Sequence, residues 1–206
     1  MNNFTKITTS LTLALLVFVG ALGTTLAASA PAPTKPGSTF EERLNQRKAE
    51  RGIVLDEKDQ TRLVNTCITG QTKMRLIQVE LVPAIANRIA VYQKIDAKLL
   101  VTIGSLKLAS KDTFKLEKDR LLLADKTAQF QVLATNLTQA IDDTEIMNCK
   151  ADPAGFRAMM ETIKLYYTDL QKQSFDSRDF LVNTIKPELA IHADDLQVKT
   201  PTSGRN

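Results

Sequence analysis

The sequence predicts an all-α protein, an elongated antiparallel three-helix coiled bundle with a short N-terminal helix. Along three long segments, apolar residues recur at spacings of three, four and seven, the periodicity of amphipathic helices. Glycine is scarce, with 8 residues in 206, and tryptophan is absent. This composition disfavours a β-rich enzyme and is typical of an extended helical protein.

Residues 1–28 have the pattern of a secretory signal peptide. Lys6 makes the start lightly positive, an apolar run of about 17 residues follows, and small residues mark a cleavage zone. We expect cleavage after Ala27 or Ala28, because a cut after Ala30 would leave a proline at the new N-terminus. The alternative is an uncleaved membrane anchor, since the run approaches the length of a spanning helix.

The mature chain is predicted to begin with a Pro-rich linker, residues 29–37, and a short polar helix over residues 39–51. Ser38 can cap this helix while the carboxylate three residues later reaches back, as in a capping box. Gly52 ends the helix. Asp56 is a good N-cap for the helix that follows.

A long helical arm is predicted from about residue 56 to residue 109, with one apolar stripe. The stripe comprises Leu63, Cys67, Met74, Ile77, Leu81, Ile85, Ile89, Tyr92, Ile95, Leu99, Ile103 and Leu106. Pro83 removes one backbone donor and clashes with the preceding turn, so we expect a kink there. Two separate helices that meet at Pro83 are the alternative.

The second arm, from about residue 112 to residue 145, has a heptad repeat. Its apolar positions are Leu116, Leu123, Phe130 and Leu137, with Leu133 and Ile141 between them. A seven-residue repeat predicts left-handed coiled packing. Ser110 and Asp112 can both act as caps in the turn that precedes this arm.

The third arm begins with Asp152 as N-cap and Pro153 at the first helical position. Its apolar face consists of Phe156, Met160, Ile163, Tyr167 and Leu170, and it resumes at Leu181 and Ile185. Pro187 is expected to end or kink the helix. The helical bundle domain thus spans residues 38–197, and residues 198–206 form a disordered tail.

Cys67 and Cys149 are the only cysteines, and the two arms return them to the same level. The first arm climbs about 63 Å from Cys67, and the second arm with its following loop descends about as far. We therefore expect a disulfide and an oxidising compartment. Two free thiols are the alternative, whereas the spacing of a redox-active pair is absent.

Four stretches carry a resemblance to a known group of proteins. They are CKADPAGF (residues 149–156), NTIKPEL (183–189), KDTFKLEKD (111–119) and QRKAER (46–51). Together they resemble secreted long-helix proteins, helical hairpins or three-helix bundles, of candidate-phyla-radiation bacteria. The likeness covers most of residues 38–190 and implies a fold and a compartment. That group has no assigned activity to carry over.

No constellation of residues predicts catalysis, a cofactor, a metal or a small-molecule substrate. His192 is the single histidine, and one imidazole beside two aspartates on a terminal piece is typical of surface decoration. The acidic groups around residues 56–59 and 142–145 lack the glycine and the ligand spacing of a calcium loop. Phosphate-binding and nucleophile-elbow motifs are absent as well. We therefore expect a protein that is not an enzyme.

The charge pattern disfavours nucleic acid as a partner. The chain has 27 basic and 23 acidic residues; without Lys6 of the signal peptide the balance is 26 minus 23, or +3. Basic residues of the second arm alternate with acidic ones, which is typical of a solvated face. Membrane contact is expected only through the signal segment if it stays uncleaved.

The leading functional hypothesis is an exported, non-enzymatic helical scaffold or adaptor that acts through protein contacts at the cell surface or in the periplasm. Tyr92, Tyr166 and Phe175 are the candidate partner surface. Tyr166 and Phe175 fall outside the core stripe, and an exposed aromatic side chain beside that stripe can anchor a partner. The alternatives are a periplasmic holdase-type chaperone and a weak binder of anionic polymer, either cell wall or DNA. An uncovered apolar face can also pair with a second copy of the chain.

Overall fold

The computed structural model describes residues 37–193, which all belong to one of the two units of the chain, Pro31–Asn206. The predicted signal peptide, almost all of the predicted linker and the predicted tail lie outside the described residues. Between residues 37 and 193 every regular element is helical, so the all-α fold class is confirmed. No helix in this range has both the length and the apolar character that crossing a membrane requires.

Helix α1 (Phe40–Arg51) begins one residue later than predicted, and its N-cap is shifted by one residue as well. Thr39, rather than Ser38, is the N-cap, and its side chain and that of Glu42 form a reciprocal capping box. The sequence allows both registers, because a glutamate follows three residues after each hydroxyl. Ser38 instead offers its backbone carbonyl to the guanidinium of Arg43. Gly52 ends the helix with φ 55°, in the left-handed region that favours glycine.

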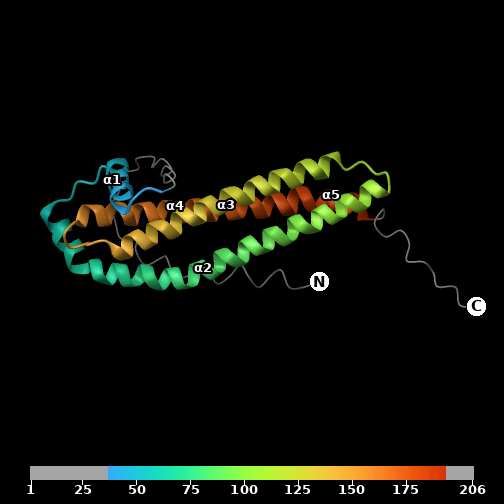
Figure 1. The fold of residues 1–206 in the computed structure, drawn as a ribbon. Helices are drawn as coiled ribbons and strands as arrows, with labels where there is room; N and C mark the ends of the chain where they lie inside the picture. Colours follow the sequence, from blue (N-terminus) through green and yellow to red (C-terminus); the bar gives the residue numbers. More distant parts are fainter. Residues whose placement is uncertain (1–36, 194–206) are drawn as a thin grey trace, which may run out of the picture. The chain divides into compact units, whose positions relative to one another are not determined.

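Helix α2 (Glu57–Leu108) is one continuous helix of 52 residues, so the alternative of two helices is wrong. Asp56 caps it, as predicted, by accepting a hydrogen bond from the backbone N–H of Asp59 at 2.6 Å. Pro83 lies inside the helix and is exposed to solvent. Figure 1 shows α2 changing direction near its middle, as expected where a proline interrupts the hydrogen-bond ladder.

A tight turn connects α2 to α3 (Phe114–Ile146) without glycine. Ser110 takes the left-handed conformation, with φ 54°, and Lys111 N–H donates to the carbonyl of Leu106 at 3.0 Å. This is the pattern of a Schellman ending. Thr113 is the N-cap of α3, without a capping hydrogen bond from its side chain. Asp112, one residue before it, accepts a hydrogen bond from the backbone N–H of Phe114 at 2.9 Å, so it satisfies a donor of the first turn without being the N-cap.

Helix α4 (Pro153–Phe180) continues through a π-helical segment, η2 (Leu181–Ile185), into α5 (Lys186–Ile191). Asp152 caps α4 by accepting from Gly155 N–H at 2.9 Å, with Pro153 at the start, both as predicted. Pro187 does not end the helix. The widened π turn directly before it, with Lys186 N–H bonded to Leu181, separates the proline ring from the carbonyls of the preceding turn.

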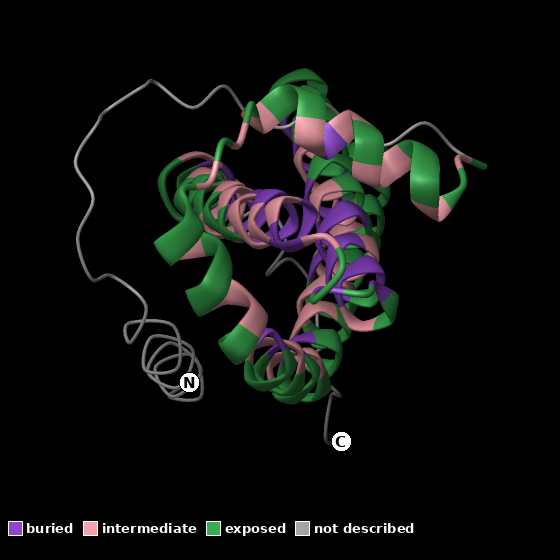
Figure 2. Ribbon diagram, turned by 90° about the vertical axis from the view of Figure 1, so that its left-hand side faces the viewer, coloured by how far each residue is buried: buried purple, intermediate pink, exposed green. Residues whose placement is uncertain are grey.

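The three long helices pack side by side, with α3 in contact with both α2 and α4, and α2 in contact with α4 (Figure 1). The heptad positions Leu116, Leu123, Phe130 and Leu137 are all buried, as predicted. Figure 2 shows buried residues on the sides of the helices that face one another and exposed residues outside. The left-handed supercoil inferred from the heptad stays a prediction.

The core consists of two clusters of buried apolar residues. The larger surrounds the cysteine pair and runs along α2, α3 and α4, and the smaller lies beneath the α2–α3 turn, where Ile185 of η2 packs. All twelve predicted stripe residues of α2 belong to or pack against these clusters. At Gly70 the helices approach closely, because an added Cβ would lie 2.8 Å from the ring of Phe156.

Candidate interaction surface

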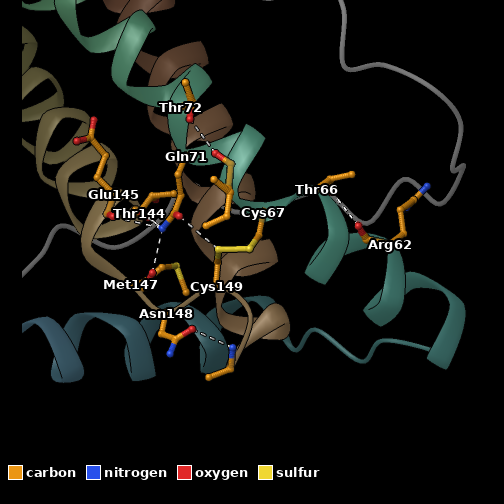
Figure 3. Close-up of a disulfide and its surroundings, with 12 residues drawn as sticks. Arg62, Thr66, Cys67, Gln71, Thr72, Thr144, Glu145, Met147, Asn148 and Cys149 are labelled. Carbon is orange, nitrogen blue, oxygen red and sulfur yellow. Dashed lines mark hydrogen bonds between the residues drawn. A yellow bond between two sulfur atoms is a disulfide. The ribbon is translucent and has the colours of Figure 1, made fainter.

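The cysteine pair is joined as predicted. Cys67 of α2 and Cys149, in the loop after α3, form a disulfide with Cα atoms 5.8 Å apart, and both residues are buried (Figure 3). No free cysteine exists in the chain. The disulfide therefore fixes the loop between α3 and α4 to the first third of α2.

Beside the disulfide, the side chain of Gln71 satisfies the end of α3. Its amide nitrogen donates to the backbone carbonyls of Thr144 at 2.8 Å, Met147 at 2.9 Å and Glu145 at 3.3 Å. Figure 3 shows these contacts converging on one amide group. The last carbonyls of a helix have no partner within the helix, so a side chain from α2 supplies one.

Replacing Gln71 by leucine is expected to lower the free energy of unfolding by about 1–3 kcal/mol, because part-buried carbonyls lose their donor. Urea unfolding followed by circular dichroism measures the change. Replacement of the neighbouring, exposed Thr72 by alanine is the control, and its effect should stay within about 0.5 kcal/mol. Equal stability of the Gln71 variant and the wild type would show that water replaces the amide at no cost.

The three aromatic candidates for a partner surface have different environments. Tyr92 is 2% exposed and packs edge-to-face on Phe130, with ring centroids 5.7 Å apart, so it belongs to the core. Tyr166 is 1% exposed, and only Phe175 is exposed, at 56%. The prediction of a surface role is therefore wrong for both tyrosines. Tyr166 belongs to the larger core cluster, and the buried stripe of α4 consists of Phe156, Met159, Ile163, Tyr166 and Leu170. Met160 and Tyr167, which the sequence placed on that face, are only partly buried, so the predicted face is wrong at these two positions.

Helix α1 contacts α4 and packs Phe40 and Leu44 against the larger core cluster, and three polar side chains add contacts. The guanidinium of Arg47 lies 5.3 Å from the centre of the Tyr166 ring and donates to its hydroxyl at 2.5 Å. Arg43 forms a bidentate pair with Asp143 of α3, at 2.7 and 2.5 Å. Lys48 pairs with Asp152 at 2.9 Å. The acidic group at residues 142–145 thus contributes a buried partner, Asp143, to α1.

Burial raises the pKa of Tyr166 above its ordinary value near 10, although the charge of Arg47 opposes this. Burial also raises the pKa of Tyr167. A raised pKa in the folded state means that the contribution to stability is present below pH 10 and is lost as the pH rises through the folded value. We expect the free energy of unfolding to decrease above about pH 10, and less steeply in Tyr166→Phe. Urea titrations between about pH 8 and 11 check this, and identical slopes would contradict it.

The part of the chain that the structure describes contains no group of three or more potential metal ligands. His192 Nε2 lies 3.8 Å from Glu188 Oε1 on the same helical turn, with a side chain 13% exposed. The imidazole is therefore more buried than the predicted surface position implies. Two shallow, open depressions on the described surface each follow a short stretch of α2 alone, and neither brings together side chains from different elements.

A second apolar stripe runs along α2 on the side that contacts no other described helix. From Ile68 to Leu108, twelve residues that follow one another in steps of three or four are all exposed and uncharged. These twelve residues, the outer stripe, are Ile68, Thr72, Leu76, Val79, Pro83, Ala86, Ala90, Gln93, Ala97, Leu100, Gly104 and Leu108. Only Thr72 and Gln93 are polar. The side chains of Leu76 and Val79 are 65% and 68% exposed.

The outer stripe was not predicted from the sequence, although its spacing is visible there. The core stripe of α2 explains most of the apolar residues of the segment, so the remaining ones pass as scattered surface residues, which are common. A search for a second apolar face on the same helix would have found it. A helix that is apolar on two faces needs a second partner surface or leaves apolar area in water.

Comparisons of the chain with protein-family models, with curated proteins and with solved structures gave no match.

Proposed function

We propose that this protein is an exported, non-enzymatic helical scaffold or adaptor that acts through protein–protein contacts at the cell surface or in the periplasm. The observation that carries the proposal is the outer stripe of α2, an exposed apolar face about 60 Å long by the rise of a helix. Soluble proteins seldom expose apolar patches of several hundred Å² unless they serve binding. The hypothesis drawn from the sequence placed the partner surface on three aromatic residues, and we now assign that surface to the outer stripe.

Export is supported by two features of the chain. The pattern of residues 1–28 is that of a signal peptide, and the disulfide between Cys67 and Cys149 favours an oxidising compartment. The resemblance to secreted long-helix proteins agrees with both. The intact mass of the natively produced protein tests export: we expect loss of the first 27 or 28 residues and thiol labelling only after reduction. A full-length mass with both thiols labelled directly would contradict it.

Protein contact at the outer stripe is tested by site-specific photocrosslinking in the producing cell. A photoreactive residue replaces Ala97 in the stripe, and in the matched control it replaces Ala128, an equally exposed alanine on α3. Adducts that form from position 97 and not from position 128 support an adaptor. The absence of adducts from position 97 would refute the proposal.

The same stripe favours one alternative, a holdase-type chaperone that shields unfolded clients. Lys94 and Lys98 border the stripe beside Ala97 and Val101 on an open part of the surface, so an apolar segment with acidic flanks would be complementary to it. A holdase suppresses the aggregation of a reduced client at near-stoichiometric ratios. Suppression that disappears in Leu100→Asp would favour the chaperone, whereas no suppression by the wild type would favour the adaptor.

A further inference from the structure

We propose that the outer stripe of α2 is a self-association face, on which the α2 helix of a second copy packs antiparallel about a two-fold axis near residue 88. This inference rests on the proposed function and names its partner. From Thr72 to Gly104 the stripe alternates strictly in steps of four and three. That is the a/d repeat of a coiled coil, sustained over more than four heptads.

The repeat and the length of the stripe select the same alignment. Ile68 and Leu108 are its ends, and full overlap of two antiparallel stripes places residues whose numbers sum to 176 opposite each other. In this alignment every a position faces a d position of the partner. The layers are Thr72 on Gly104, Leu76 on Leu100, Val79 on Ala97, Pro83 on Gln93 and Ala86 on Ala90, each formed twice. Small residues occupy the central layers, so the two backbones can approach closely there.

Charges beside the stripe agree with this alignment. In antiparallel pairs the residues that follow d positions face each other across the contact. Here Glu80 would face the partner's Lys94, and the partner's Lys98 would lie one turn away. The two-fold axis would form this pair a second time, between Lys94 and the partner's Glu80. All three side chains belong to exposed residues, and within residues 37–193 none of them has an ion-pair partner. Shifting the alignment by one heptad toward the N-terminus would bring Lys94 opposite Lys73, a repulsive pair.

The surface of α2 is open where the proposed layers would form. Lys94, Ala97, Lys98 and Val101 border a shallow, nearly flat part of it, on which the partner's Val79 would pack at Ala97. At Gly104 an added Cβ would meet nothing within 4 Å, so this part of the face is open as well. Val79 and the carboxylate of Glu80 that follows it thus match Ala97 and the two lysines beside it.

The area of contact predicts a weak dimer. Contact along the whole face, about 60 Å long and about 10 Å wide, would bury at most roughly 600 Å² on each copy, or about 1,200 Å² in total. This is the lower end of specific interfaces. The outer side of a helix that bends around its core is convex, so contact is closest near Ala86 and Ala90. We therefore expect a micromolar dissociation constant rather than a nanomolar one.

Sedimentation velocity of the natively produced protein, from about 1 to 200 µM, is the first test. We expect a monomer–dimer equilibrium that Ala90→Asp weakens at least tenfold, because the new charge enters a central layer twice. The matched control, Ala128→Asp on α3, should dimerise like the wild type. Circular dichroism confirms that both variants fold. A wild type that stays monomeric throughout, or equal weakening by both variants, would overturn the proposal.

Charge exchange tests the antiparallel alignment. Glu80→Lys and Lys94→Glu should each weaken the dimer severalfold, and the double variant should recover the wild-type affinity. A parallel pair would place Glu80 near the partner's Arg75, and the double variant would then remain weak. Failure of the rescue would therefore overturn the antiparallel arrangement.

Photocrosslinking from position 97 distinguishes the failure of this inference from the failure of the proposed function. Adducts with twice the mass of the chain support self-association. Adducts only with other proteins would overturn it and leave the adaptor standing. Adducts within one chain, to lipid, or with nothing would overturn both proposals.

Discussion

Opening the disulfide between Cys67 and Cys149 is expected to lower the free energy of unfolding by about 4.5 kcal/mol, the value of the chain-entropy relation for a loop of this size. The bridge closes a separation of 82 residues that includes most of α2 and all of α3. Reduction lets the denatured chain explore many more conformations while it changes few native contacts. A bundle of three long helices has little core per residue, so this loss is a large part of its stability.

The comparison that isolates this effect uses the wild type with and without a reductant, because both states keep the two sulfur atoms in the core. Urea unfolding followed by circular dichroism gives the difference. The variant Cys67→Ala, Cys149→Ala should unfold at a still lower urea concentration than the reduced wild type, since it also loses two buried side chains. Coincident transitions for the oxidised and reduced wild type would show that the disulfide contributes nothing to stability.

The elements that depend on local sequence were predictable. Caps such as Asp56 and Asp152 act within three residues of their own position, and apolar stripes report one face of one helix. For the same reason the ends of the helices lie close to their predicted positions. The disulfide was predictable although its cysteines are 82 residues apart, because long straight helices convert residue counts into distances.

Features that depend on which helix covers which face could not be predicted. Tyr166 lies outside the stripe that was predicted for α4 but is buried in the core, because sequence alone cannot show that the polar helix α1 also packs on α4. The pairs Arg43–Asp143 and Arg47–Tyr166 join residues 100 and 119 positions apart. No periodicity links the two partners of either pair, because the periodic pattern of each helix comes from its apolar residues and not from these polar ones. Continuity at Pro187 likewise depends on a π turn that spacing does not predict.

Replacing Asp143 by asparagine is expected to destabilise the protein by about 3–5 kcal/mol, because it leaves the charge of Arg43 enclosed without its counter-charge. The side chains of Arg43 and Asp143 are 13% and 2% exposed. Gln139 also donates to this carboxylate, at 3.1 Å. The hydrogen bond to Asp143 raises the pKa of Arg43. In the variant, the guanidinium stays charged at neutral pH, since the ordinary pKa of an arginine lies far above neutrality.

The neighbouring Asp142→Asn is the matched control. Asp142 is exposed and accepts a hydrogen bond from Gln78, so its loss should cost less than about 1 kcal/mol. The double variant Arg43→Met, Asp143→Leu removes both charges and should recover most of the stability, because the enclosed ion is gone. Hydrogen exchange should show α1 opening first in Asp143→Asn, since the pair connects α1 to α3. Equal effects of the two asparagine variants would mean that water already solvates Arg43, and that the contacts on α4 alone hold α1 in place.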